Sequence, residues 1–290
     1  MHAPNVWLVT GASGGFGTAL VNAVLARGDR VIATARSLDK MRSLPETDRI
    51  RLLQLDITAG PAALKEIMAA AVAFWGRIDV LVNNAGYGAK ALVEEAGSAE
   101  MRRQYETNVF GTLDVATAVL PYMRAERCGT IVMIGSRTSW RPELTCTGLY
   151  ASSKAALRVF SETLASELAP FGIRMLIVEP AAFRTDALIG NAVYTGNALP
   201  DYDVMRAMAA QRYKDTHKAL RGDPAKAMGA VVDVVRGEGA AAGKAWPLYL
   251  VLGDLGVSGV AEKCERVLHL LDEWKEVSTG LDIDPEEEAR

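Results

Sequence analysis

Residues 9–20, "VTGASGGFGTAL", join a short apolar run to a helical pattern through a glycine-rich turn. The run before it covers residues 5–10, and the helical periodicity after it covers residues 17–28. Glycines allow a tight turn, let a phosphate approach the backbone, and let the helix pack close to a sheet. The free N–H groups at the helix start then favour a pyrophosphate, although a merely flexible turn is the alternative. The spaced glycines are Gly11, Gly15 and Gly17.

The same alternation continues along the chain and predicts an α/β fold. Continuous Val, Ile and Leu runs separated by helical patterns are typical of parallel strands that are covered on both faces. Right-handed crossovers then give a doubly wound parallel sheet of about seven strands, with ligands at the carboxyl ends of the strands. The further strands are expected at 30–35, 51–55, 78–83, 129–136, 173–180 and 247–253, and the main helices at 61–75, 98–124 and 148–168.

Two segments depart from this rhythm within what we expect to be one domain over residues 1–290. Residues 181–222 mix prolines, glycines, tyrosines and methionines, and predict a substrate-loop insertion with one or two short helices. Residues 257–290 predict a C-terminal extension, with an amphipathic helix at 260–277 and an acidic tail that is frayed or disordered.

Composition narrows the class of protein. A formal net charge of -3 argues against a nucleic-acid-coating surface. No apolar stretch approaches the ~18–20 residues of a membrane span, and the start lacks a signal-peptide pattern, so the expected location is the cytoplasm. The cysteines and histidines are scattered without the spacing of disulfide or metal sites, so we expect no metal. They are Cys128, Cys146, Cys264, His2, His217 and His269.

The end of the second predicted strand indicates which dinucleotide binds. A site for NAD usually has an acidic residue there, which bonds the ribose 2′-hydroxyl. Here Arg36 occupies that zone, and its planar fork suits a 2′-phosphate. We therefore expect NADP(H) in preference to NAD(H). The alternative is a surface arginine that Asp39 neutralises.

Tyr150 and Lys154 lie four positions apart at the start of a predicted helix, with only small residues between them. Residues at i and i+4 share a helix face. A free tyrosine has a pKa of about 10, and a neighbouring ammonium favours the phenolate. The pair by itself is more typical of an exposed helix surface, and only the surrounding motifs favour a functional pair.

"VIATARS", the acidic tail and the strand "PLYLVLG" followed by a helix look similar to reductases near the hydroxysteroid and retinol dehydrogenases. Four motifs in order make the chain similar to the short-chain dehydrogenase/reductase family, in its single-domain branch. They are "TGASGGFG", "NNAG" at 83–86, Ser136 after the fifth strand, and "YASSK" at 150–154. The resemblance covers residues 5–185 closely. It implies a Rossmann fold and a nicotinamide-dependent oxidoreductase.

The resemblance also implies catalytic roles. Tyr150 would be the general acid of ketone reduction, and Lys154 would tune it and hold the nicotinamide ribose. Ser136 would donate a hydrogen bond to the substrate oxygen, with Ser139 as an alternative. The family often has two serines here, whereas this chain has Gly135 at the first position. Asn108 would support a proton-relay water, or would simply bond the backbone.

The cofactor site that the resemblance implies runs along the carboxyl ends of the strands. "EPAAFRTDAL" has Ala181 where the family usually has glycine, which leaves the local backbone in question. Asp56 would contact adenine, or would cap a turn. The expected cofactor-binding residues are Gly11, Ser13, Gly15, Phe16, Gly17, Arg36, Asp56, Ile57, Asn83, Ala85, Gly86, Tyr150, Lys154, Pro180, Phe183 and Thr185.

The substrate region favours an apolar or aromatic carbonyl compound, because the insertion is rich in tyrosine, leucine and methionine. The alternative is that these side chains pack the insertion's own helices. The expected lining residues are Trp140, Leu188, Tyr194 and Tyr202.

The sequence thus predicts an NADP(H)-dependent carbonyl reductase or alcohol dehydrogenase. Two alternatives remain: an epimerase or dehydratase, which would need an extra acid near the nicotinamide, and a non-catalytic dinucleotide sensor or scaffold. The helices at 98–124 and 148–168 resemble the family's oligomer interface, so a homodimer or homotetramer is expected.

Overall fold

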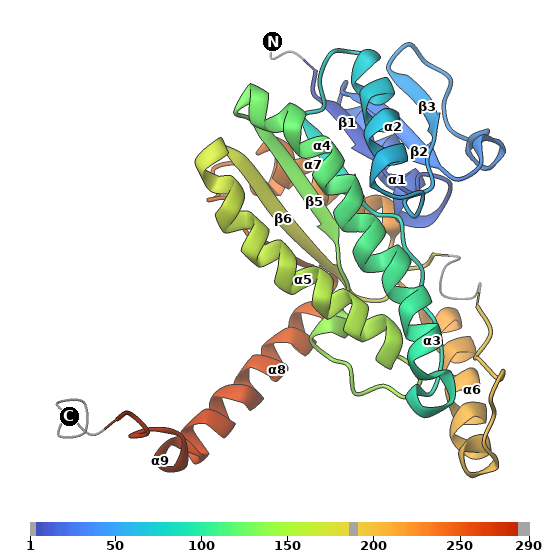
Figure 1. Ribbon diagram of the computed structural model, residues 1–290, viewed down its shortest axis with the longest axis vertical. Coiled ribbons are helices and arrows are strands. Elements are labelled where there is room, and N and C mark those ends of the chain that lie inside the picture. Colours follow the sequence, from blue (N-terminus) through green and yellow to red (C-terminus); the bar gives the residue numbers. More distant parts are fainter. Residues whose placement is uncertain (1–3, 186–190, 284–290) are drawn as a thin grey trace.

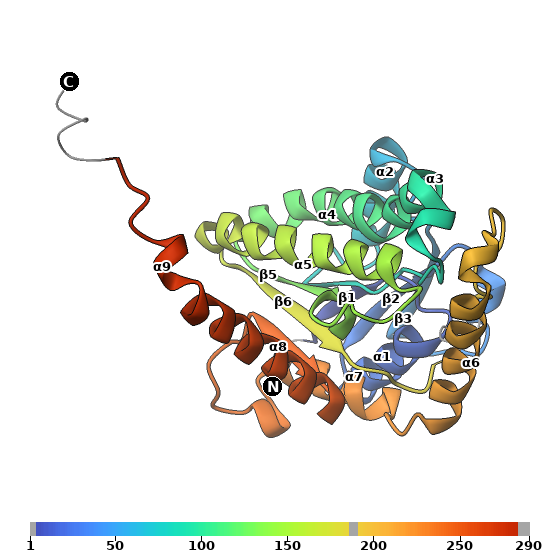
Figure 2. The ribbon, with the colours of Figure 1, turned by 90° about the horizontal axis from the view of Figure 1, so that it is seen from below.

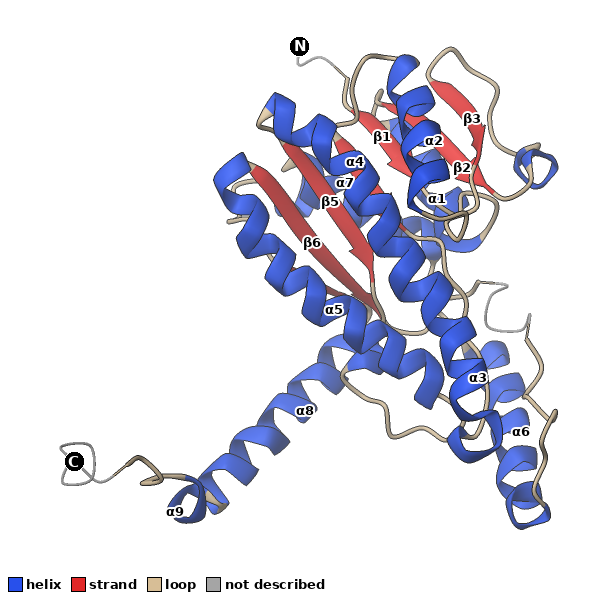
Figure 3. Ribbon diagram, in the orientation of Figure 1, coloured by secondary structure: helices blue, strands red, loops and turns tan. Residues whose placement is uncertain are grey.

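A seven-stranded parallel sheet organises the computed structural model, which describes residues 4–185 and 191–283 (Figures 1 and 3). The strand order is β3-β2-β1-β4-β5-β6-β7, and every neighbouring pair is parallel. The predicted doubly wound fold is therefore confirmed. The strands are β1 (Val6–Val9), β2 (Arg30–Ala35), β3 (Ile50–Gln54), β4 (Val80–Asn83), β5 (Gly129–Ile134), β6 (Ile173–Pro180) and β7 (Tyr249–Leu252).

Alternation along the buried strands separates two cores. In β1, Trp7 and Val9 face one core, whereas Val6 and Leu8 face the other. Helices α1 (Gly15–Ala26) and α7 (Pro224–Arg236) cover the first face. Helices α2 (Pro61–Ala73), α4 (Thr112–Glu126) and α5 (Gly148–Leu168) cover the second, as Figure 2 shows.

The long helix predicted at 98–124 is interrupted twice. It begins as α3 (Val93–Tyr105), passes through a π-helical turn η2 (Glu106–Gly111), and continues as α4. Gly97 has a φ of 57°, which breaks α3 just before the predicted start at Ser98. The residues from Ser98 onward therefore form the helix that the sequence predicts, with one extra turn before it.

The insertion contains one long helix, α6 (Asp203–Ala219), after a short 3-10 turn η6 (Pro200–Tyr202). The prediction of only short helices was wrong in this respect. Helix α6 lies beside the start of α3 (Figure 1), where the buried Glu95 pairs with Arg206. Because α6 is only weakly amphipathic, its apolar periodicity does not predict this contact with α3.

Helix α7 was missed by the sequence analysis, although its start carries clear signals. Asp223 caps it by accepting a hydrogen bond from the N–H of Ala225 at 2.8 Å, and Pro224 occupies the first helical position. Its buried side chains, among them Met228 and Val232, fill the core beneath β1. The fold needs α7 to close that face of the sheet.

The C-terminal helix α8 (Asp254–Glu273) begins six residues before the predicted 260 and is followed by α9 (Lys275–Ser278). Figures 1 and 2 show it leaving the body of the molecule. Residues Asp254 to Arg266 attach it to the rest of the protein, through ion pairs of Glu262 with Arg141 at 2.7 Å and of Arg266 with Glu143. Among the helices in the described ranges, none is both long and apolar enough to cross a membrane.

Candidate active site

The sheet order reverses between β1 and β4, which places the glycine turn beside the segment after β4. Ligands of open α/β sheets bind at such a switch point, outside the carboxyl ends of the strands. The loops after β1, β4, β5 and β6 carry most of the predicted site residues. The structure therefore gathers at one edge of the sheet residues that lie up to about 170 positions apart in the chain.

The glycine turn leaves no room for side chains at two positions. A Cβ on Gly17 would lie 2.1 Å from the carbonyl oxygen of Gly11, and Gly11 itself has a φ of 67°. Helix α1 starts at Gly15, and its first turn has no acidic residue. Its N-terminus can therefore accept an anion, as the sequence predicts for the pyrophosphate.

Asn84 fastens this turn to β4, a role that the sequence analysis did not assign. Its amide Nδ2 donates to the carbonyl oxygens of Thr10 at 2.9 Å and Gly11 at 3.0 Å. The Thr10 hydroxyl in turn accepts from the N–H groups of Asn84 and Ala85. Asn83, by contrast, is buried and donates to the Met133 sulfur at 3.3 Å, so its side chain lies within the sheet.

The segment after β6 meets the glycine turn from the other side. A Cβ on Gly15 would lie 3.4 Å from the Cβ of Thr185. The rings of Phe16 and Phe183 form an edge-to-face pair with centroids 5.4 Å apart. Phe183 is buried, and with Pro180 it anchors this segment to the sheet. Ser13 is exposed at the turn, where its hydroxyl is open to a ligand.

Arg36, Asp56 and Ile57 lie at the ends of β2 and β3. Asp39 forms an ion pair with Arg42 at 2.7 Å, so the described residues contain no ion-pair partner for Arg36. Asp56 accepts from the N–H and hydroxyl of Thr58 at 2.9 and 2.8 Å, which lowers the pKa of Asp56. It therefore caps a turn, as the alternative interpretation predicted, while Arg36 lowers its pKa further.

Tyr150, Lys154 and Ser136 come together where α5 crosses the end of β5. Ser136 lies close enough to Tyr150 to lower the pKa of its phenol, while the Ser136 hydroxyl accepts from the N–H and hydroxyl of Thr138 at 3.2 and 2.9 Å. The ammonium of Lys154 donates to the carbonyl oxygen of Ile134 at 2.6 Å and lies 5.9 Å from the Tyr150 ring centroid. Ser136 and Lys154 are buried, whereas Tyr150 remains partly exposed to the crevice.

Burial shifts both titrating groups toward their neutral forms. It lowers the pKa of Lys154 to about 8, against a smaller raising effect of Glu179. It also raises the pKa of Tyr150, while Ser136 acts in the opposite direction. Among the groups that shift the pKa of Tyr150, Ser136 is thus the one that favours the phenolate.

Asn108 lies in the π-helical turn η2, a feature that often marks functional sites. Its side chain donates to the Tyr87 carbonyl at 2.9 Å and to the Ser153 hydroxyl at 3.1 Å, and accepts from the Tyr87 N–H at 3.1 Å. A Cβ on Gly86 would lie 3.0 Å from Asn108 Oδ1 and 3.7 Å from Lys154 Nζ. Gly86 therefore allows the loop after β4 to approach both side chains.

Glu179, near the end of β6, is a site residue that sequence reasoning missed. It is fully buried, and its carboxylate accepts from the Ser136 N–H at 2.8 Å. Ser139, the alternative to Ser136, donates to the same carboxylate at 3.3 Å. A charged residue inside an apolar strand was the available signal, because carboxylates are rarely buried without partners.

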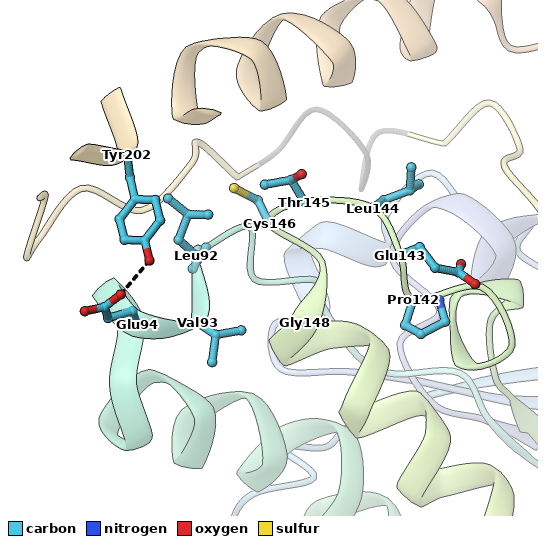
Figure 4. A pocket seen from close by; sticks show the side chains of 11 residues that line it. Leu92, Val93, Glu94, Pro142, Glu143, Leu144, Thr145, Cys146, Gly148 and Tyr202 are labelled. Atoms are coloured by element: carbon cyan, nitrogen blue, oxygen red, sulfur yellow. Dashed lines mark hydrogen bonds between the residues drawn. The ribbon is translucent and has the colours of Figure 1, made fainter. Parts of the chain in front are cut away.

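Figure 4 shows a pocket of about 540 Å³ next to the start of α5. Tyr202 points into it and donates to Glu94 at 2.5 Å. The pocket adjoins Gly148 but does not include Tyr150, so it neighbours the catalytic group without containing it. Its lining is Ala91, Leu92, Val93, Glu94, Pro142, Glu143, Leu144, Thr145, Cys146, Gly148 and Tyr202.

The other predicted lining residues lie elsewhere. Trp140 packs edge-to-face against Tyr249, with the Arg158 guanidinium 4.3 Å from its ring centroid. Tyr194 packs on the small cluster around Leu149, and Leu188 lies outside the described residues. Within residues 4–185 and 191–283 no group of His, Cys, Asp and Glu side chains could hold a metal ion.

Comparisons with known proteins agree with this geometry. A family model described as short chain dehydrogenase matches residues 5–192. The chain is 34% identical to "Oxidoreductase BOA17" of Botryotinia fuckeliana over 279 residues, which cover 94% of this chain and 97% of that protein.

Two solved structures are also similar. A short-chain dehydrogenase from Streptomyces avermitilis superposes with a TM-score of 0.83 at 38% identity, covering 97% of this chain and all of that one. A structure of ElxO with NADPH bound has a TM-score of 0.60 at 29% identity, covering 65% of this chain and 77% of that one.

Proposed function

The chain belongs to the short-chain dehydrogenase family, and on that premise we propose that it transfers a hydride between NADP(H) and the carbonyl or secondary alcohol of an apolar or aromatic substrate. The observation that carries the proposal is the placement of Ser136 beside Tyr150, whose pKa it lowers, with Lys154 one helical turn away. Nicotinamide, when bound, supplies or accepts the hydride.

The residues of the crevice fit a dinucleotide. The backbone around Gly11 and Gly17 excludes side chains, and the N-terminus of α1 favours a pyrophosphate. Thr185, close to Gly15, and the loop at Ala85 and Gly86 would flank the nicotinamide half. With these contacts the cofactor would lie along the carboxyl edge of the sheet and not on either helical face.

The chain's own residues divide the proton chemistry. Ser136 and Tyr150 would both bond the substrate oxygen, which orients it and stabilises developing negative charge. Tyr150 gives its proton to that oxygen during reduction and retrieves it during oxidation. Lys154, held by the Ile134 carbonyl, supplies positive charge nearby, and Asn108 fixes the adjacent loop through Tyr87.

The test is the turnover of Tyr150→Phe with NADPH and a panel that contains acetophenone and androstenedione. Loss of the general acid should lower kcat by about 10²–10⁴-fold. Tyr122→Phe, on α4, removes a phenol outside the site and should keep wild-type activity. Equal turnover in wild type and Tyr150→Phe would exclude this mechanism.

Arg36 supports the preference for NADP(H). It is exposed at the end of β2, and the nearby Asp39 is engaged by Arg42 instead. Arg36→Ala should therefore lower the ratio of kcat/KM for NADPH to that for NADH by about tenfold, as expected for a lost charge-assisted contact. Lys40→Ala removes a nearby exposed charge, leaves the Asp39–Arg42 pair in place and is the matched control, and an equal change in both variants would contradict the assignment.

The pocket beside α5 supports a bulky, largely apolar substrate, because Leu92, Val93, Leu144 and Cys146 line it.

A homodimer through α4 and α5 is supported by the exposed side chains Phe110, Leu113 and Val159. A cytoplasmic location is supported by the free thiols of Cys128, Cys146 and Cys264. We treat residues 1–290 as one domain with a substrate loop at 181–222 and an extension at 257–290.

Glu179 bears on the alternative of an epimerase or dehydratase, which needs a second acid in the crevice. Its carboxylate has no exposed surface and lies behind the backbone of Ser136, whose N–H it accepts. That placement supports a role behind the reacting groups and not a contact with substrate.

A further inference from the structure

Glu179 lies beneath the turn that presents Ser136. Its carboxylate accepts from the Ser136 N–H at 2.8 Å and from the Ser139 hydroxyl at 3.3 Å to both oxygens. The Ser136 side chain, two bonds from this anchored N–H, is the one that lies beside Tyr150 and lowers its pKa. The Glu179 carboxylate therefore binds the backbone of Ser136 and not the reacting side chains. It binds both ends of the turn, at Ser136 and at Ser139.

Gly135 shows that this place is built for a carboxylate. A Cβ on Gly135 would lie 2.9 Å from the Glu179 carboxyl carbon and 2.9 Å from its Oε1. A serine at 135 would therefore displace the carboxylate or the turn. The glycine at 135, where the family often has a serine, therefore leaves the space that the buried Glu179 carboxylate occupies.

Opposite charges face Glu179 from helix α5. The positive charges of Lys154 and Arg158 lower the pKa of Glu179. The negative charge of Glu179 raises the pKa of Tyr150 on the same helix. Lys154 also donates to the Ile134 carbonyl at 2.6 Å, two residues before Ser136. At this strand end the Lys154 ammonium therefore binds the Ile134 carbonyl, and the Glu179 carboxylate binds the Ser136 N–H.

We propose that Glu179 is a positioning residue for the reaction, whose carboxylate holds Ser136 toward Tyr150 and whose negative charge acts on the Lys154 ammonium. This inference rests on the proposed function for its kinetic consequence, but the state of Lys154 can be measured without any substrate.

The pair titrates in the neutral range. Burial raises the pKa of Glu179 to about 7, although the Ser136 N–H, Lys154, Ser139 and Arg158 lower it. Lys154 has a pKa of about 8, lowered by burial and raised by Glu179. Reduction should therefore lose rate below about pH 7, as Glu179 is protonated, and above about pH 8, as Lys154 loses its proton.

The decisive variant is Glu179→Gln, which removes the charge and keeps a carbonyl oxygen for the Ser136 N–H. NMR of the full chain labelled with ¹³Cε-lysine reports the titration of Lys154, and Lys154→Arg identifies its signal. Loss of the opposite charge should move the Lys154 midpoint to lower pH by on the order of one unit. Glu66→Gln, on the exposed side of α2, should leave it unchanged.

The kinetic arm uses NADPH with the ketone of the panel that the wild type reduces best. Glu179→Gln should lose the acidic limb of the pH profile and shift the alkaline limb to lower pH. Glu179→Asp keeps the charge and should retain both limbs with a lower kcat. A role in folding alone would move none of these limbs.

An unchanged Lys154 midpoint in folded Glu179→Gln would overturn the inference, whatever the activity. If Glu179→Gln did not fold, Ser139→Ala would replace it. This variant removes one donor to the carboxylate and should raise the pKa of Glu179, moving the acidic limb to higher pH. An unmoved acidic limb would then overturn the inference. Absence of turnover in the wild type would contradict the proposed function and leave the NMR result to decide on Glu179.

Discussion

Gly14 and Gly17 lie in the same turn but differ in what surrounds them. A Cβ on Gly17 would lie 2.1 Å from the Gly11 carbonyl oxygen and 2.8 Å from the Ala12 Cα, both of them backbone atoms that cannot move aside. Gly14 has an extended φ of 180° and nothing within 4 Å of its Cβ position. Close backbone packing therefore requires glycine at position 17, whereas no packing contact requires it at position 14.

We expect Gly17→Ala to destabilise the protein by about 1–3 kcal/mol, the usual cost of overpacking, and to abolish measurable NADPH binding. Gly14→Ala should change the free energy of unfolding by less than about 0.5 kcal/mol, as for an open surface position. Thermal unfolding and NADPH fluorescence titration measure the two effects. Comparable destabilisation by both variants would show that the close approach in this turn is misassigned.

Single residues differ in how far sequence predicts them. Tyr150 and Lys154 are brought onto one helix face by their spacing alone, and Ser136 by its position after a strand. Glu179 and Asn84 carry no such local pattern. Their roles depend on which loop lies across from them, since Glu179 contacts a residue 43 positions away and Asn84 one 74 positions away.

At the scale of elements, α6 is held to α3 by a buried ion pair. The Glu95 side chain is fully buried, and its carboxylate pairs with Arg206 and accepts from the Leu199 N–H at 2.8 Å. Arg206 also contacts Asp203 within α6. Removal of one partner from such a pair leaves a buried charge unpaired.

Arg206→Ala should therefore destabilise α6 by about 3 kcal/mol and raise KM more than it lowers kcat, because the segment before α6 contributes Tyr202 to the pocket beside α5. Hydrogen exchange should rise in residues 203–219 while the strands stay protected. Arg102→Ala, on the exposed side of α3, is the control. Unchanged exchange in α6 would contradict the role given to this pair.

The strands were predicted closely, because each is a continuous apolar run that ends at a turn. The helices were less predictable where tertiary contacts decide them. Gly97 breaks α3 through a positive φ, and α6 is held by its ion pair with Glu95 and by burial of Ala209 in a small cluster with residues distant in sequence. Helix α7 had readable caps at Asp223 and Pro224, but the chain before it was assigned as an irregular insertion.

For the whole molecule, two apolar surfaces remain open. One lies on η2, α4 and α5, with Phe110 and Val159 about half exposed at 52% and 53%. The other lies on α8, where Leu271 and Trp274 are 62% and 56% exposed. In the described part of the chain, α8 contacts β7 and η3 (Arg137–Ser139) and does not cover α4 or α5, as Figure 2 also shows.

We expect light scattering to give twice the chain mass for the wild type and the monomer mass for Val159→Glu, because a charge in an apolar interface opposes association. Leu271→Glu is the matched variant on α8 and should remain a dimer. A monomeric Leu271→Glu beside a dimeric Val159→Glu would place the interface on α8 instead.

The sequence by itself determined the order of strands and helices, the glycine turn and the spacing of Tyr150 to Lys154, because each of these is a pattern over a few neighbouring residues. Only the tertiary structure decided that Glu179 lies behind Ser136, that Asn84 rather than Asn83 fastens the glycine turn, and that α6 docks on Glu95. The physical reason is that the partner of a buried polar group is set by which strand ends become neighbours, and hydrophobic periodicity does not encode that pairing.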